Sequence, residues 1–537
     1  MPFYTASKST FEVGGKEFPR ITWYKEPGMR TLYITLMFAV LTSATNGYDG
    51  SMMNGLQTLP AWQTSFNNPD ASTRGLLNAI MSVGSIVALP ITPYIADIFG
   101  RRAGVITGCI TMIIGVALQS IGANIQMFIA ARFLIGFGVA IAHGAAPLLI
   151  AELVHPQHRA IFTTIYNSTW YFGSIVAAWL TYGTLSIQSA WSWRIPSLVQ
   201  AAPSVIQLVA IWMVPESPRY LIAKGKTEKA LKILANAHAR GDTQDELVQI
   251  EYREINETLR LEQEFETNGW LDLFKTPGNR RRLIILFTLG FFSQWSGNGL
   301  VSYYMNDVLT AAGVQSSKTR LEINGILNII NFAVALTMCF FIDKFGRRPL
   351  FIFATGGMFM AFCAWTVCAA QFVKTQVSGA ATAEIFFIFL YYVFYNSAWS
   401  GLLVGYAVEI LPYKIRAKGL TLMFLAVDLA LFFNSYVNPI ALGALGWKYY
   451  IVYDVWLFIE LLTVYFFYVE TRNTPLEEIC KHFDGETALL GGDLATEKAR
   501  HYLVEEIGND GKIVPASTTR EVSEEVSDGN GSPKTEA

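Results

Sequence analysis

Long runs of hydrophobic residues dominate the chain, and short polar stretches separate them. A helix needs about 20 mainly apolar residues to cross the hydrocarbon core of a membrane. Windows of that length lie near 32–52, 75–95, 103–123, 127–150, 162–184, 195–214, 284–306, 322–342, 349–371, 383–408, 419–441 and 446–468. The pattern predicts an all-α integral membrane protein with twelve transmembrane helices, arranged as six plus six.

Charged motifs between these windows occur twice. The segment DIFGRR at 97–102 returns as DKFGRR at 343–348, 246 residues later. Two further pairs recur at nearly the same offset: Glu152 with Arg159 and Glu409 with Arg416, 257 residues apart, and Glu216 with Glu470, 254 residues apart. Three similar offsets indicate a duplicated half. Parallel repeats of this size are typical of secondary transporters whose two bundles move about a site at their interface.

This repeat also predicts the domain organisation. Between the two sets of windows lies a charged stretch in which apolar residues recur at helical spacing. The end of the chain is rich in Gly, Ser and acidic residues, a composition that favours disorder. The expected units are an N-terminal segment at 1–31, a six-helix bundle at 32–214, a helical linker at 215–282, a second six-helix bundle at 283–470 and a largely disordered tail at 471–537.

Composition supports a membrane protein and excludes several other classes. The chain is 52% hydrophobic and 15% charged, with a mean hydropathy of +0.33. Such values are atypical of a soluble enzyme. Its five cysteines show no CxxC spacing, so we expect no disulfide framework and no metal site. We find no nucleophile–base arrangement, Walker motif or basic–aromatic patch, and therefore expect no enzyme activity, no cofactor and no nucleic-acid partner.

The distribution of Lys and Arg predicts the orientation. Short loops after the even-numbered windows carry residues such as Arg101, Arg347, Lys414 and Arg416. Basic residues in short loops favour the cytosolic side of the membrane. Both termini and the linker are therefore expected to be cytosolic, in a multi-pass protein of the plasma membrane.

The repeated D-x-F-G-R-R segments follow the second and eighth windows. Their glycine permits a tight turn, and their charged side chains can form strong bonds with helix ends and with Glu152 or Glu409. A basic loop that only follows charge asymmetry is the alternative, but two copies with matching glutamates favour a gate. The expected gating set comprises Asp97, Arg101, Arg102, Glu152, Arg159, Glu216, Arg219, Asp343, Arg347, Arg348, Glu409, Arg416, Glu470 and Arg472.

Asp49 lies inside the first hydrophobic window. A carboxylate at membrane depth is costly unless it is paired or functional, and Arg132 in the fourth window is a buried cation that can partner it. Protonation of the acid would release the arginine, so the pair could report proton occupancy. The alternative is a static buried ion pair.

The chain resembles the sugar porters of the major facilitator superfamily over roughly residues 30–480. The resemblance rests on GYDGSMMN at 47–54, ARFLIGFG at 131–138, PLLIAEL and HR within 147–159, PESPR at 215–219, SQWSGNGLVSYY at 293–304, DKFGRRPL at 343–350 and VEILPYKIRAKG at 408–419. The residues in these motifs look most like those of fungal lactose permeases, cellodextrin transporters and hexose transporters. The resemblance implies the major facilitator fold and import of a sugar by proton symport through alternating access.

The family also implies roles for particular residues. Asp49 matches the proton site of proton-coupled members, and Arg132 matches its partner. Amides and an aromatic ring suit the hydroxyls and the C–H face of a sugar. The expected substrate-binding residues are Asn46, Asn167, Gln294, Asn298, Asn331, Trp399 and Asn434, and Tyr303 and Tyr304 are expected to gate the site from outside.

Several positions depart from the family pattern. Ser293, Gly299 and Asn46 stand where relatives carry larger residues, and Asn434 lies one turn from the usual helix 11 asparagine. Smaller residues predict a roomier pocket, as a disaccharide such as lactose or cellobiose would need, although a hexose remains open. The sequence assigns no role to His143, Asp428 or Glu460.

Two other functions compete with symport. In a proton-independent facilitator, Asp49 and Arg132 would be only structural. In a non-transporting sugar sensor, the cytosolic tail would signal, but the tail is short for that role. The expected partners are a small sugar, a proton and the lipid bilayer, and the sequence gives no indication of the oligomeric state.

Overall fold

The computed structural model describes residues 10–13, 16–265, 272–339, 341, 345–411, 413–472, 479 and 483. The first part of the chain contains β1 (Thr10–Val13), β2 (Lys16–Pro19), η1 (Trp23–Lys25), α1 (Pro27–Thr58), α2 (Pro60–Ser65), α3 (Ala71–Ala88), α4 (Thr92–Ile98), α5 (Arg101–Ile121), α6 (Ile125–Leu153), η2 (Pro156–His158), α7 (Arg159–Thr184), α8 (Trp191–Val199), α9 (Ala201–Ala210) and η3 (Ile211–Met213). The remainder contains α10 (Pro218–Ala223), α11 (Thr227–His238), α12 (Glu246–Phe265), α13 (Asp272–Lys275), α14 (Pro277–Gln294), α15 (Asn298–Ala311), α16 (Ser317–Cys339), α18 (Arg347–Thr375), α19 (Ser378–Ile410), α20 (Tyr413–Leu445) and α21 (Lys448–Phe467).

Most of these helices have the length and composition of membrane spans. In the described part of the chain, nine spans pass a test of length and apolarity, or ten when the bent pair α3 and α4 is counted as one. Helices α1 and α7 are long enough but carry many Ser, Thr, Asn and Gly residues, and they are not among these spans. With these two included, the structure has the twelve spans that the hydrophobic pattern predicts.

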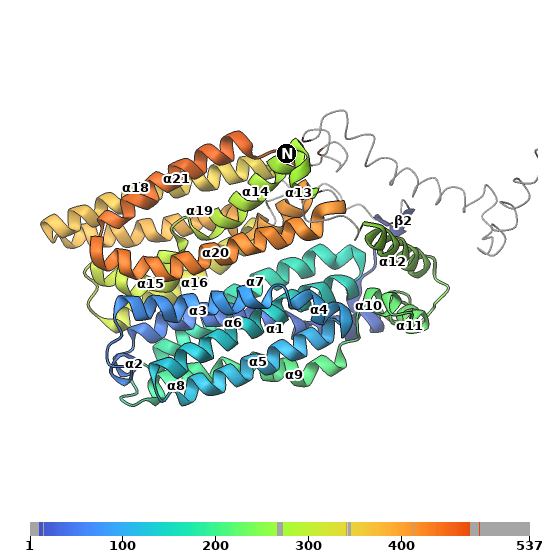
Figure 1. Ribbon diagram of the computed structural model, residues 1–537, viewed down its shortest axis with the longest axis horizontal. Coiled ribbons are helices and arrows are strands. Elements are labelled where there is room, and N and C mark those ends of the chain that lie inside the picture. Colours follow the sequence, from blue (N-terminus) through green and yellow to red (C-terminus); the bar gives the residue numbers. More distant parts are fainter. Residues whose placement is uncertain are drawn as a thin grey trace, which may run out of the picture.

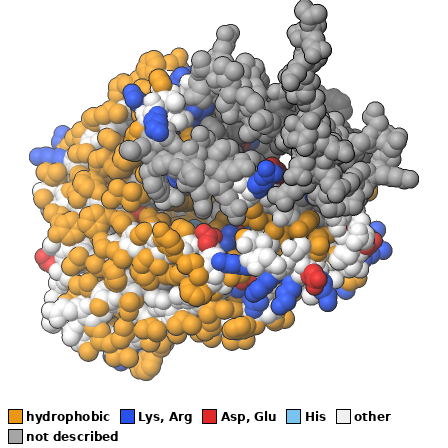
Figure 2. Space-filling model, turned by 45° about the vertical axis from the view of Figure 1, so that its right-hand side comes forward, with side chains coloured by type: hydrophobic (Ala, Val, Ile, Leu, Met, Phe, Trp, Pro, Cys, Tyr) orange, Lys and Arg blue, Asp and Glu red, His pale blue; other side chains and the backbone are white. Residues whose placement is uncertain are grey.

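The helices form two groups. In Figure 1, helices α1 to α9 lie in the lower group and α14 to α21 in the upper group. The groups meet where α3 packs on α20, α7 on α16 and α1 on α15. Figure 2 shows hydrophobic side chains over most of the uncovered face, as expected for helices that face lipid.

Small residues let helices approach closely inside the first group. A Cβ added to Gly47 of α1 would lie 1.8 Å from the Trp170 carbonyl oxygen of α7, and one added to Gly173 would lie 1.9 Å from the Ala44 carbonyl oxygen. Close backbone approach through glycine is a common way for membrane helices to associate, because lipid gives no hydrophobic drive between them. Helices α1 and α7 are therefore tightly packed.

The linker helices α10, α11 and α12 and the β1–β2 hairpin lie together at one end of the bundles, on the right of Figure 1. In the hairpin, β1 pairs antiparallel with β2, and Phe11 and Phe18 pack against Leu247 and Ile250 of α12. We refer to this end of the bundles as the linker end. The opposite end, which holds α2, is the far end.

The span formed by α14 and α15 is broken in its middle. Residues 295–297 interrupt the helix, and Gly297 has a φ of 102°, which favours glycine. The break frees backbone groups at membrane depth, and side chains satisfy them: Asn434 donates to the Gln294 carbonyl, and Asn298 accepts from the Gly299 amide. Broken helices of this kind occur in membranes where they border a cavity.

Candidate functional site

The first copy of the repeated charged motif builds a compact cluster at the linker end. Arg101 contacts Glu152, with Nε to Oε2 at 3.3 Å, and Asp97, with Nη1 to Oδ1 at 2.9 Å. Glu216 accepts the backbone N–H groups of Arg101 at 3.1 Å and Arg102 at 3.3 Å. The Ser217 hydroxyl donates to Glu152. Burial raises the pKa of Glu216, although these N–H donors act in the opposite direction.

The second copy builds the same cluster in the other group of helices. Arg347 lies 2.8 Å from Glu409. Glu470 accepts the backbone N–H groups of Arg347 at 2.9 Å and Arg348 at 3.2 Å. The Thr471 hydroxyl donates to Glu409, as Ser217 does to Glu152. The sequence repeat therefore corresponds to a repeated set of bonds.

A glycine makes each cluster possible. Gly100 and Gly346 precede α5 and α18, with φ of 107° and 89°. A Cβ added to Gly100 would lie 2.5 Å from a Glu216 carboxylate oxygen, and one added to Gly346 would lie 2.7 Å from a Glu470 oxygen. Both the backbone conformation and the close carboxylate thus require glycine.

The structure describes four of the five remaining members of the expected gating set. Arg416 donates to the Leu411 carbonyl from Nε at 3.3 Å, and the Arg472 backbone N–H donates to Glu470 at 2.8 Å. Arg159 is exposed and Arg219 is half-buried in the first turn of α10. Asp343 lies outside the described residues.

A buried charged network lies inside the first group of helices. Asp49 of α1 is 0% exposed and forms an ion pair with Arg132 of α6. Gln200, between α8 and α9, donates to Asp49 Oδ1 at 2.6 Å, and Gln119 of α5 donates to Gln200 Oε1 at 3.0 Å. Side chains of four spans therefore form one network around this carboxylate. Sequence reasoning found the ion pair but missed both glutamines, whose only signal is an amide within an apolar window.

Several expected sugar-binding residues are exposed or half-buried. Asn167 is exposed, and Asn46 and Gln294 are half-buried, as is Tyr303, an expected gating residue. Asn167 lies one helical turn from Tyr171, whose hydroxyl donates to Asn396 of the other helix group, so it shares the face of α7 that is turned toward that group.

The helices carrying these residues meet near Gly50. A Cβ added there would lie 3.8 Å from the Tyr303 ring and 3.9 Å from the Trp170 ring, so α1, α7 and α15 approach one another at this level.

A chain of amides crosses between the two groups of helices. The Tyr171 hydroxyl of α7 donates to Asn396 Oδ1 of α19, and Asn396 Nδ2 donates to Asn331 Oδ1 of α16 at 3.0 Å. Asn331 is an expected sugar-binding residue, whereas Asn396 and Tyr171 were missed. Amides that bond one another across this junction can exchange those bonds for bonds to sugar hydroxyls.

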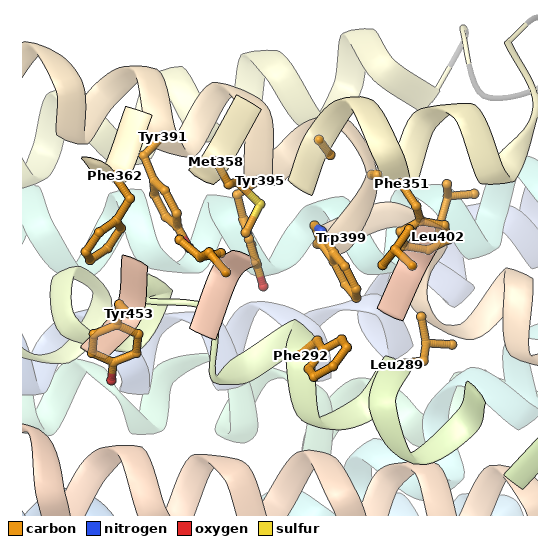
Figure 3. Close-up of a cluster of buried hydrophobic side chains, with 14 of the residues drawn as sticks. Leu289, Phe292, Phe351, Met358, Phe362, Tyr391, Tyr395, Trp399, Leu402 and Tyr453 are labelled. Atoms are coloured by element: carbon orange, nitrogen blue, oxygen red, sulfur yellow. The ribbon is translucent and has the colours of Figure 1, made fainter. Parts of the chain in front are cut away.

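Three other expected residues are buried inside the second group. Asn298 donates to the Tyr395 hydroxyl at 3.1 Å, and Asn434 accepts from the Tyr453 hydroxyl at 3.0 Å. Trp399 is 1% exposed, and its indole N–H donates to Thr355 at 3.1 Å. Figure 3 shows its ring among the apolar side chains of this core, near Phe351. In this conformation all three hold the bundle together.

The extra space expected at Gly299 is absent. A Cβ added there would lie 2.8 Å from Asn434 Nδ2, so the asparagine side chain occupies the volume that glycine leaves. Ser293 is also buried, and its hydroxyl donates to the Gly290 carbonyl at 2.7 Å. Only Asn46, which is half-buried, remains of the three positions that suggested a roomier pocket.

The far end is closed by contacts between the two helix groups. Tyr304 of α15 is buried, accepts from Asn78 of α3 at 2.9 Å, and donates to the Ser435 carbonyl of α20. Tyr182 of α7 donates to Glu322 of α16 at 3.0 Å. Tyr304 is thus part of the inter-bundle contacts that close the far end.

Comparison with known proteins agrees with this architecture. A family model described as "Sugar (and other) transporter" matches residues 35–483. The "High-affinity glucose transporter" of Kluyveromyces lactis is 28% identical over 480 residues, which are 85% of this chain and 86% of that protein. The "High glucose sensor RGT2" of Saccharomyces cerevisiae is 27% identical, and the match covers 81% of this chain and 58% of the sensor.

A solved structure shares the fold. The proton:xylose symporter XylE, bound to 6-bromo-6-deoxy-D-glucose, matches with a TM-score of 0.69 at 24% identity, over 84% of this chain and 99% of the symporter. The same arrangement of spans is therefore present in a solved transporter. Because the family model covers most of the chain and its helices have this fold, the chain belongs to the sugar (and other) transporter family of the major facilitator superfamily.

Proposed function

We propose that this protein imports a monosaccharide across the plasma membrane by proton symport, through alternating access. The observation that carries the proposal is the Asp49 site: a fully buried carboxylate, held by Arg132 and Gln200, in a bundle that faces the inter-bundle amides. In the proposed orientation the linker end is cytosolic, because the short basic loops lie there. The far end then faces the outside.

The proton acts through the ion pair. Ionised Asp49 attracts Arg132 strongly in a low-dielectric interior. Protonation removes the negative charge but leaves the side chain able to bond Gln200, so Arg132 loses its counter-ion and can seek another acceptor, such as the Leu77 carbonyl to which its Nε already donates at 3.3 Å. Such a change in α6 and α1 would alter how the first bundle packs, and so link protonation to rocking of the bundles.

The sugar binds where the two bundles meet. Asn46, Asn167, Gln294 and Asn331, together with Asn396, present amides at this junction, and Tyr303 presents an aromatic ring. We assign a monosaccharide rather than a disaccharide because Asn434 fills the space beside Gly299. The glucose transporter and the xylose symporter among the similar proteins carry names consistent with that size.

The test is accumulation in proteoliposomes with an imposed proton gradient. Wild-type protein should concentrate labelled glucose or xylose inside, and Asp49→Asn should abolish accumulation while retaining exchange of sugar down its gradient. Glu460→Gln is the matched control, since Glu460 is an equally buried acid in the other bundle, and it should retain coupling. Accumulation by Asp49→Asn would show that Asp49 is not the coupling residue, whereas wild-type protein that equilibrates sugar without accumulating it would be a facilitator. Failure of wild-type protein to move any sugar of a broad panel would favour a sensor.

A further inference from the structure

A second repeated motif, distinct from the charged loops, lies at the far end. Thr73, Arg74 and Asn78 begin α3, and Thr319, Arg320 and Asn324 begin α16, 246 residues later. This offset equals that of the D-x-F-G-R-R segments at the other ends of the same spans. The two Thr-Arg-x-x-x-Asn segments are therefore equivalent positions in the two halves.

The two asparagines make equivalent contacts across the molecule. Asn78 donates to the Tyr304 hydroxyl at 2.9 Å, which joins α3 to α15. Asn324 Oδ1 accepts from Asn54 Nδ2 at 3.4 Å, which joins α16 to α1. In each case the second span of one half bonds the first span of the other half. The far end thus has two related contacts between the bundles, which we call the α3–α15 seam and the α16–α1 seam.

The two arginines differ. Arg74 Nη1 lies 2.8 Å from both carboxylate oxygens of Asp307 in α15, so this ion pair crosses between the bundles. The two side chains are 23% and 22% exposed. Arg320 instead donates to the hydroxyls of Thr310 and Ser317, which belong to its own bundle. The α3–α15 seam therefore contains an ion pair between the bundles, whereas the hydrogen bonds of Arg320 stay within its own bundle. We call the first the charged seam and the α16–α1 seam the uncharged seam.

We propose that the Arg74–Asp307 ion pair keeps the far end closed, and we call this pair the latch. The neutral hydrogen bond between Asn78 and Tyr304 joins the same two helices and supports it. The inference rests on the proposed alternating access. To open the far end, the bundles must separate along α3 and α15, which breaks this pair. Charge-assisted bonds in a partly buried site contribute more than neutral ones, so loss of the latch should raise the open-to-closed ratio of the far end by about tenfold or more.

The experiment measures the far-end distance directly in the full chain. In a background without the five native cysteines, spin labels are placed at Thr64 and Val377, which are exposed at the far ends of the two bundles. Double electron–electron resonance in lipid nanodiscs then gives the distance distribution. Wild-type latch residues should give mainly the short, closed distance. Arg74→Gln and Asp307→Asn should each add a longer distance.

Two further variants make the result decisive. Arg320→Gln is the matched control, because it removes the equivalent arginine from the uncharged seam, and it should leave the distribution unchanged. Arg74→Asp combined with Asp307→Arg should restore the closed distance. Unchanged distributions in both single variants, or equal opening by Arg320→Gln, would overturn the latch. If a single variant is not monodisperse, Arg74→Lys replaces it, and partial opening is then expected because the charge is kept.

This test is independent of the transport test. It uses neither a sugar nor a proton gradient, so a failure to find transport leaves the distance result intact. Conversely, an unaltered distance in the latch variants removes the latch but not the proposed symport.

Discussion

The linker end and the far end of this molecule use duplicated residues in opposite ways. At the linker end, Arg101 bonds Glu152 and Arg347 bonds Glu409, and each pair lies within one bundle. At the far end, Arg74 reaches across to Asp307 in the other bundle, but its equivalent Arg320 bonds within its own. Duplication preserved the first arrangement in both copies and the second in only one.

The two kinds of contact differ in how many folded units they depend on. Contacts within a bundle depend on a single folded unit, so two copies of the sequence give two copies of the geometry. Under the proposed alternating access, contacts between bundles are made and broken in each transport cycle, and a second charged latch would add to the barrier. We therefore expect substitutions at the linker end to change mainly the stability of each bundle, and substitutions at the far end to change mainly the conformational equilibrium.

The largest expected effect concerns the glycines of the linker-end clusters. Gly100→Ala and Gly346→Ala should each lower the free energy of unfolding by roughly 1–3 kcal/mol or more, because both backbones lie in a region that only glycine adopts readily and both sites face a carboxylate. Thermal unfolding in detergent measures the loss. Gly225→Ala is the control: its φ is also positive, at 71°, but its surroundings are open, so the loss should be smaller. A clearly unequal loss in the two clusters would break the equivalence of the halves.

An intermediate effect concerns the docking of the linker helices. His155, between α6 and η2, is buried with its ring 5.0 Å from His238 of α11 and 5.2 Å from Phe11 of β1. Burial lowers the pKa of His155 to about 3, with the charges of His238, His158 and Arg159 acting in the same direction. The pKa of His158 is also lowered, by burial and by Arg20 and His238. The docked state therefore holds both rings neutral.

The sign of the pH effect follows from these lowered values. Docking of the linker helices is fully stable above the ordinary histidine pKa of about 6.5 and weakens below it. The reason is that both rings bind protons more readily in the undocked state than in the docked state. The slope is at most about 1.4 kcal/mol per pH unit for each ring. Hydrogen exchange of α11 and α12, corrected for intrinsic rates, should show lower protection at pH 5.5 than at pH 7.5. His155→Phe should reduce that difference, while His143→Gln, in the membrane, should not. Equal pH dependence in His155→Phe would refute this account.

The smallest effect compares the two asparagine seams. Asn78→Ala should open the far end measurably, by about 1 kcal/mol, because its bond to Tyr304 is 2.9 Å long. Asn54→Ala should have a smaller effect, since its contacts with Asn324 and the Val301 carbonyl are 3.4 and 3.5 Å long. The spin-label distances described above measure both. A larger opening by Asn54→Ala would assign the main seal to the uncharged seam.

The spans and the internal repeat could be predicted from the sequence alone. The length of each apolar run fixes a membrane helix, since backbone groups in lipid must bond within their own helix. The repeated motifs predicted which charges recur, and Arg101 with Glu152 and Arg347 with Glu409 are paired as their spacing suggested. The Asp49–Arg132 pair was also predictable, because a buried acid at membrane depth requires a partner and few cations are available there.

Which polar groups meet depends on how the helices pack against one another. Helices that are apolar on most sides carry little periodicity, so their rotation about their own axes cannot be read from the sequence. That rotation brings Gln200 to Asp49, buries Trp399 beside Thr355, and places Asn434 in the space left by Gly299. It also gives Arg74 a carboxylate and Arg320 two hydroxyls, although the two arginines occupy equivalent positions in the repeat. The partner of each residue depends on how separate helices face one another, which is a property of the assembled bundles and not of any one segment.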